Sequence, residues 1–170
     1  MTGPDPYLYE LAEHGFVEED AARFEALWER LESAYFQRIA EVTAPFAGWR
    51  DRFRAAATET ARLVESYRPE ARFLAVDALA AGELGRRHQR AFAARVAELL
   101  DSAREELPDP GATPESTSSW IVAFFFDRVY RRCTVAGSPG LPSQLPEMMF
   151  LAISAYFGTE AGLEELIPPP

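Results

Sequence analysis

An unbroken apolar run of seven residues, from Trp120 to Phe126, constrains the fold of this chain more than any other feature. Such a run could form a buried strand, but apolar residues continue at helical spacing beyond it. Thr113 and Pro114 are typical of a helix start, and Gly137 is typical of a helix end. The sequence therefore predicts a helix across this stretch.

The predicted helix carries apolar side chains on two opposite faces. At about 100° per residue, one stripe contains Val122, Phe126, Val129 and Cys133, and the opposite stripe contains Trp120, Phe124, Asp127 and Arg131. Aromatic residues on both faces require burial on both sides. In a chain of 170 residues, the simplest second partner is another copy, so we expect a homodimer.

Size and composition predict one globular domain. A mass of 19.0 kDa is enough to bury roughly 70% of the unfolded surface. No apolar run approaches the roughly 20 residues of a membrane-spanning helix, and the beginning of the sequence lacks the pattern of a secretion signal. We therefore expect a cytoplasmic protein that does not contact a membrane.

Charge and motif content exclude several function classes. The net charge of −10 argues against direct nucleic-acid binding, because phosphates require a concentrated basic surface. A single cysteine with two histidines makes an internal disulfide impossible and a structural zinc site unexpected. The sequence also lacks a Gly-rich phosphate loop and a nucleophile elbow. We expect no metal, no cofactor and no enzymatic activity, since Asp77 with His88 is the only pair that an enzyme interpretation could use.

Helical spacing continues along the rest of the chain and predicts an all-α bundle without strands. We expect further helices over residues 7–13, from near 18 to past 42, 45–67, 70–81, from about 85 to 107, 143–157 and a short one after 158, with a loop at 108–114. Gly82 and Gly85 mark a break or bend between two of these helices.

The inner faces of these helices provide candidates for a ligand pocket. The candidates are Trp49, Phe53, Phe73, Asp77, His88, Phe92 and Phe126. An apolar lining favours a hydrophobic or aromatic small molecule, with Asp77 or His88 fixing its orientation. Two alternatives stay open: Asp77 can pair with an arginine at the helix edge, and His88 can be satisfied within the core.

The last long helix has a bulky stripe and a stripe of small or adaptable residues. Because small residues let helices approach closely, we expect the bulky stripe in the core and the small one against a partner. The candidates for the dimer interface are Trp120, Phe124, Asp127, Arg128, Arg131, Met148, Ala152 and Ala155. Asp127 of one copy could then pair with Arg128 or Arg131 of the other, at the rim.

Three stretches, in this order, resemble the C-terminal regulatory domain of TetR-family transcriptional regulators: residues 68–82, 120–137 and 155–161. The first resembles a helix that begins with proline and carries an acidic residue late in an apolar run. The other two resemble the two dimerisation helices. The resemblance implies a homodimer held by a four-helix bundle, two helices from each copy, and an apolar effector pocket framed by the earlier helices.

The resemblance does not extend to the helix-turn-helix with which a complete family member begins. Here one short acidic helix precedes the long helix. We expect a short helix and connection at 1–17, the regulatory domain at 18–166 and a loose tail at 167–170. The leading hypothesis is a dimeric, small-molecule-sensing regulatory domain without its own DNA-binding head. The alternative is a helical interaction module that pairs with a full-length regulator and binds no small molecule.

Overall fold

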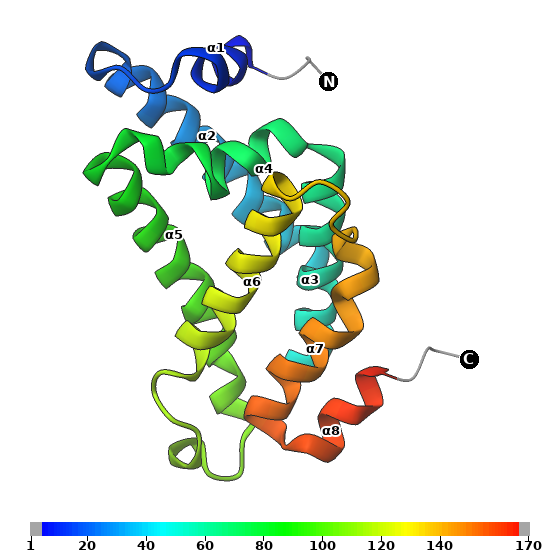
Figure 1. Cartoon of the computed structure of the whole chain (residues 1–170). Helices are drawn as coiled ribbons and strands as arrows, with labels where there is room; N and C mark the ends of the chain where they lie inside the picture. The colour runs from blue at the N-terminus through cyan, green and yellow to red at the C-terminus, as the bar shows by residue number, and fades with distance from the viewer. Residues whose placement is uncertain (1–4, 167–170) are drawn as a thin grey trace.

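The computed structural model describes residues 5–166, and this part contains helices and connections but no strand (Figure 1). Its eight α-helices are α1 (Pro6–His14), α2 (Ala21–Thr43), α3 (Trp49–Ser66), α4 (Arg68–Ala75), α5 (Glu83–Asp101), α6 (Thr117–Thr134), α7 (Leu141–Phe157) and α8 (Thr159–Leu163). The predicted all-α class is confirmed, whereas the predicted tail at 167–170 lies outside the described residues. None of the described helices is long and apolar enough to cross a membrane.

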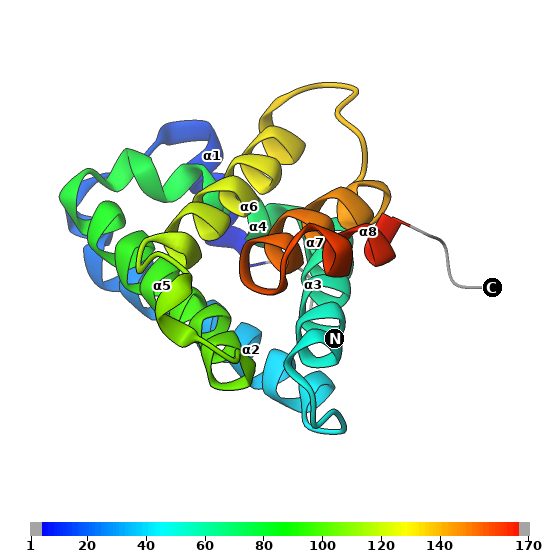
Figure 2. The same ribbon diagram turned by 90° about the horizontal axis from the view of Figure 1, so that it is seen from below.

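The long helices surround a common interior. Viewed from below, α2 and α5 lie on one side, α3 on a second, and α6 with α7 on a third (Figure 2). Helix α3 packs against α2 and α7, and α5 packs against α6. Helix α4 crosses one end of this arrangement, where it contacts α3 and α6. The interior is therefore enclosed by six helices.

The predicted helix at 70–81 is in fact two elements. Helix α4 ends at Ala75, and a 3-10 helix, η2, covers Asp77–Ala81. The chain is redirected there because α5 crosses it closely: a Cβ added at Gly85 would lie 1.7 Å from the Ala78 carbonyl oxygen. Gly82 completes the bend with a φ of 61°, which L side chains rarely adopt.

Three other helices begin at positions that differ from the predicted ones. Helix α3 begins at Trp49 and not near residue 45, and its first N–H donates to Glu106 Oε1 at 2.7 Å. Helix α7 begins at Leu141, whose N–H donates to Glu65 Oε1 at 3.0 Å. Helix α6 begins at Thr117 because Arg104 binds the carbonyl oxygens of residues 113 and 114 and holds them in the preceding loop. These starts depend on side chains distant in the sequence.

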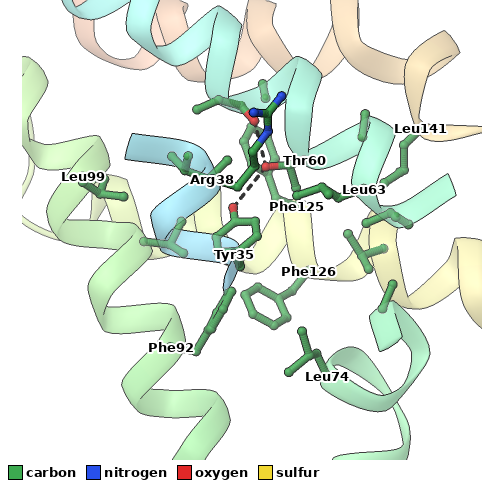
Figure 3. Close-up of a pocket in the computed structure, with 18 of the residues that line it drawn as sticks. Tyr35, Arg38, Thr60, Leu63, Leu74, Phe92, Leu99, Phe125, Phe126 and Leu141 are labelled. Atoms are coloured by element: carbon green, nitrogen blue, oxygen red, sulfur yellow. Dashed lines mark hydrogen bonds between the residues drawn. The ribbon is translucent and has the colours of Figure 1, made fainter. Parts of the chain in front are cut away.

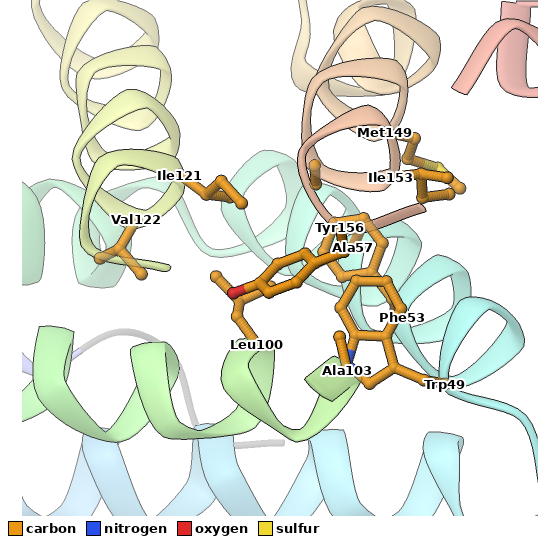
Figure 4. Packing of buried hydrophobic residues seen from close by; sticks show 11 residues of the cluster. Trp49, Phe53, Ala57, Leu100, Ala103, Ile121, Val122, Met149, Ile153 and Tyr156 are labelled. Atoms are coloured by element: carbon orange, nitrogen blue, oxygen red, sulfur yellow. The ribbon is translucent and has the colours of Figure 1, made fainter. Parts of the chain in front are cut away.

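Two large clusters of buried apolar residues and a small third one, between α3 and α7, stabilise the bundle. The first joins α3, α5, α6 and α7 and includes Trp49, Phe53, Leu100, Ile121, Met149, Ile153 and Tyr156 (Figure 4). The second joins α1, α2, α5 and the segment from α4 to η2, and includes Tyr7, Leu11, Phe24, Trp28, Phe73 and Phe92. Helix α1 thus shares a core with the long helix that follows it.

Candidate ligand cavity

A cavity of about 690 Å³ lies between the two clusters, bordered by α2, α3, α4, α5, α6 and α7 (Figure 3). Its volume is within the range of small-molecule sites, roughly 300–1,000 Å³. The cavity follows α3 from Arg52 to Leu63 and beyond. At 1.5 Å per residue these two positions are roughly 16 Å apart along the helix, so the cavity is elongated.

Four of the seven predicted pocket residues line this cavity: Trp49, Phe53, Phe92 and Phe126. The first two come from the beginning of α3, and the others come from α5 and α6. Phe92 and Phe126 meet edge to face, with ring centroids 5.9 Å apart. The stripes read from the sequence therefore identified much of the aromatic wall.

The other three predicted pocket residues do not line the cavity. Phe73 is fully buried and packs against Phe24, with ring centroids 5.1 Å apart. His88 lies on the same side of the bundle, where its ring centroid is 5.3 Å from that of Trp28 and its Nε2 is 3.8 Å from Glu25 Oε1. Phe73 of α4 belongs to the second cluster, and His88 packs against the same aromatic residues because α5 turns that face towards α2.

Asp77 also has a different environment from the predicted one. Its Oδ1 accepts a hydrogen bond from Arg72 Nε at 3.2 Å. Burial raises the pKa of Asp77, although the nearby Arg72 opposes that shift. The helix-edge pairing, which was the alternative for this carboxylate, describes the geometry. Neither Asp77 nor His88 lines the cavity, so neither side chain is placed to orient a ligand there.

The polar atoms in the middle of the cavity belong to Tyr35 and Thr60. Neither residue was among the pocket residues predicted from the sequence. Tyr35 Oη and Thr60 Oγ1 are 3.0 Å apart, and the close-up places this pair among the lining side chains (Figure 3). Burial raises the pKa of Tyr35, so its phenol is neutral at physiological pH. In the sequence, each residue falls on the apolar stripe of its helix, and this position was the signal that it faces the interior.

Charged side chains at the rim of the cavity are paired with one another. Arg38 and Arg62 both donate to Glu59 Oε1, at 2.7 Å and 2.6 Å. These hydrogen bonds, above all those from Arg62, lower the pKa of Glu59 to about 2 despite its burial. Arg52 binds the Ala47 carbonyl oxygen at 2.7 Å and lies 3.6 Å from Glu106. The arginines that line the cavity therefore have partners and are partly exposed to solvent.

The outward sides of α6 and α7 form the second notable feature, which we call the outer face: Trp120, Ala123, Phe124, Leu151 and Ala155. The Trp120 side chain is 74% exposed, and Leu151 is 40% exposed. The Arg128 guanidinium lies over the Phe124 ring, 4.6 Å from its centroid. A tryptophan this exposed is unusual on a surface that contacts only water.

Two predicted interface residues lie inside the chain instead. Ala152 is fully buried in the first cluster, and Met148, 6% exposed, lines the cavity. Their placement at a dimer interface is therefore wrong. The physical reason is that α7 packs against both α3 and α6, so that its buried arc is wide and includes the small stripe as well as Ile153. Ala152 permits the close approach of helices within one chain.

The predicted rim ion pair is also formed within one chain. Arg131 Nε donates to Asp127 Oδ2 at 2.8 Å, one turn apart on α6. Arg128 donates to Glu147 of α7 at 3.4 Å. These three α6 residues border the outer face, and such exposed pairs contribute little to stability.

The fold and site define an all-α bundle with an elongated apolar cavity inside and an apolar helix pair exposed on its surface. Comparisons with known protein families, with characterised proteins and with solved structures find no match. Within residues 5–166, no group of three or more His, Cys, Asp or Glu side chains is arranged to hold a metal ion.

Proposed function

We propose that this chain forms the small-molecule-sensing, dimeric regulatory domain of a TetR-like transcriptional regulator. The observation that carries the proposal is the cavity of about 690 Å³ inside the helical bundle. Small-molecule sites are usually large concave volumes with mostly apolar walls, and this cavity has that form. An effector bound there would gain contacts with those walls, which explains such a cavity better than a purely structural role.

The lining indicates the nature of the effector. Aromatic and aliphatic side chains from α2, α3, α5 and α6 form most of the wall. Such a wall favours a hydrophobic or aromatic molecule through the removal of apolar surface from water. The elongated form of the cavity suits a long molecule better than a compact one.

The outer face supports the proposed homodimer. Trp120, Phe124 and Leu151 lie on two neighbouring helices, and an isologous interface would place the same pair of helices from each copy together. This arrangement gives the four-helix bundle that the TetR resemblance implies. Such a regulator would act in the cytoplasm, where its target DNA lies.

Effector binding has a route to the N-terminal end of the bundle. Trp28 of α2 lines the cavity and also belongs to the second cluster, together with Tyr7 and Leu11 of α1. An occupied cavity would therefore favour one position of α2 relative to α5. In a complete TetR-family regulator the DNA-binding head precedes this helix, so the change would be delivered at the end of the bundle where such a head attaches.

A helical interaction module that pairs with a full-length regulator is the second candidate, and the exposure of Trp120 favours it. This candidate binds no small molecule, so it requires an interior that does not take up a ligand. The two candidates therefore differ in whether the cavity takes up a ligand.

Binding of N-phenyl-1-naphthylamine, an uncharged dye that fluoresces in apolar sites, tests the proposal. We expect saturable binding by the wild-type chain and at least about tenfold weaker binding by Phe92→Trp, because the larger ring occupies the cavity. Phe46→Trp is the matched control, since Phe46 is 42% exposed and does not line the cavity.

Circular dichroism would show whether Phe92→Trp is folded, and Ala56→Leu offers a second way to fill the cavity from α3. If the dye binds both filled variants as tightly as it binds the wild type, the cavity is not the binding site. If the wild type binds no dye at all, the interaction module becomes the better proposal.

A further inference from the structure

Two hydroxyl groups in the middle of the cavity form a hydrogen-bonded chain with a defined direction. Thr60 Oγ1 donates to the carbonyl oxygen of Ala56 at 2.8 Å. A carbonyl oxygen can only accept, and a threonine hydroxyl has only one proton. With the Thr60 proton on the Ala56 carbonyl oxygen, the 3.0 Å contact between Thr60 Oγ1 and Tyr35 Oη uses the proton of the tyrosine.

This direction determines what the pair can offer to a ligand. Both hydroxyl protons are committed, one to Ala56 and the other to Thr60. The Tyr35 oxygen keeps an unused lone pair, because a phenol can accept as well as donate. The raised pKa of Tyr35 keeps its proton in place and so preserves the arrangement. The centre of the cavity therefore presents a hydrogen-bond acceptor.

The surroundings of Tyr35 provide little help to a charged ligand. The Phe92 ring lies 5.2 Å from the Tyr35 ring, centroid to centroid, and 5.9 Å from the Phe126 ring, which it meets edge to face. Arg38, one turn further along α2, donates to Glu59 and Glu41 and is 46% exposed. A carboxylate placed beside Tyr35 would meet lone pairs and aromatic rings, which is costly for a desolvated ion.

We propose that the cavity selects an uncharged, elongated lipophile whose single polar group donates a hydrogen bond to Tyr35 Oη. Its chemical class is a long-chain or ring alcohol, or a phenol, in preference to a carboxylate, ether or ketone with the same skeleton. This inference rests on the proposed ligand-binding function and specifies which ligand that function requires.

The test is displacement of bound N-phenyl-1-naphthylamine by dodecyl compounds that differ only in the polar group, each used below the concentration at which it self-associates. We expect 1-dodecanol to displace the dye at a concentration about three- to tenfold lower than dodecyl methyl ether, which corresponds to one hydrogen bond. Dodecanoate at pH 8 should be weaker than both, because its charge is uncompensated.

Three variants test the direction of the hydrogen-bonded chain. Tyr35→Phe removes the acceptor, so the preference for dodecanol over the ether should fall to about onefold, with dye binding retained. Thr60→Val removes the group that accepts the Tyr35 proton, so this proton becomes available to the oxygen of either compound and the preference for dodecanol should shrink. Tyr156→Phe is the control, because its hydroxyl donates to Asp101 and lies outside the cavity.

The outcomes separate this inference from the proposed function. If the wild type does not bind the dye, the ligand-binding function itself fails. If the dye binds but dodecanoate displaces it best, and Arg38→Gln abolishes that advantage, then Arg38 serves as an anion partner and only the selectivity is overturned. The proposed selectivity would also be overturned if dodecanol and its ether displaced the dye at the same concentration, or if dodecyltrimethylammonium displaced it best.

Discussion

The molecule has two apolar regions that its own side chains do not fill, and they differ in form and polarity. The cavity is lined by six helices and contains the hydrogen-bonded hydroxyls of Tyr35 and Thr60. The outer face of α6 and α7 is open, and ion pairs such as Asp127 with Arg131 border it. An enclosed volume suits a small molecule, whereas an open face with a polar border suits a protein surface.

Helix α6 separates these two regions and contributes to both. Phe125, Phe126 and Val129 point into the cavity, while Trp120 and Phe124 lie on the outer face. The seven-residue apolar run is thus explained by two different requirements on one helix. A ligand that moves the inner side chains would also shift the outer ones, which links effector binding to assembly.

The largest expected effect comes from a charge on the outer face. Trp120→Glu should weaken the proposed dimer by at least about 30-fold, because an exposed tryptophan at an interface centre is typically worth 2 kcal/mol or more. Light scattering on a sizing column should give twice 19.0 kDa for the wild type and 19.0 kDa for the variant. Tyr9→Glu is the control, since Tyr9 is 55% exposed on α1.

A wild-type monomer at micromolar concentration would contradict the proposed dimer. The exposed Trp120 would then have to be explained by contact with another partner. A dimer that survives Trp120→Glu would show that copies associate through some other surface. Dye binding in the variant reports separately on the cavity and should be retained.

An intermediate effect distinguishes the inward and outward sides of α7. Ala152→Leu should lower the free energy of unfolding by about 1–3 kcal/mol, because Ala152 is fully buried and added methyl groups strain a packed core. Ala155→Leu should change it by less than about 0.5 kcal/mol and should alter dimerisation instead. Urea unfolding at a concentration that keeps each variant in one oligomeric state measures the difference.

Equal destabilisation by the two alanine variants would mean that α7 has no free side and would remove it from the proposed interface. A matched alanine-to-leucine pair on one helix changes helix propensity equally at both positions, so that the comparison reports on packing.

Periodicity predicted the helical class and most of the inner faces, because a helix must bury one stripe to fold. It placed Phe92 correctly in space, since its stripe has a polar opposite side, and it placed Phe126 on the one stripe of α6 that is apolar from end to end. It could not orient α7, where apolar residues occur on every side and the buried arc depends on two neighbouring helices. For Met148 and Ala152, the preference of small residues for close approach was right, but the approaching helix belongs to the same chain.

The polar centre of the cavity could not be predicted from the sequence, for a different reason. Tyr35 and Thr60 are 25 residues apart, and each is an ordinary member of an apolar stripe. Only the crossing of α2 and α3 brings their hydroxyls together. Asp77 and His88 attracted attention because they interrupt apolar stretches. Arg72 pairs with Asp77, and His88 packs against aromatic residues of α2, with its buried Nε2 left without a hydrogen-bond partner among the described residues.

The smallest expected effect concerns the charged rim of the cavity and depends on pH. The pKa of Glu59 is about 2 in the folded chain and 4.5 in a model peptide. A carboxyl group with a lowered folded pKa contributes stability above the unfolded pKa and loses it as the pH falls through the folded value. The free energy of unfolding should therefore decrease by about 1–2 kcal/mol between pH 4.5 and pH 2 because of this group, since its half-exposed arginine partners are screened by water.

Glu59→Gln isolates this contribution from that of the other carboxylates. The variant should be less stable at pH 7 and should lose less stability on acidification than the wild type, as measured by urea unfolding across this pH range. Glu41→Gln is the control, because Glu41 also binds Arg38 but is exposed. If the two variants show the same pH dependence, the pairing with Glu59 does not hold the rim arginines in place. Arg38 and Arg62 would then be available to a ligand, and the contrast between an uncharged cavity and a charged border would no longer hold.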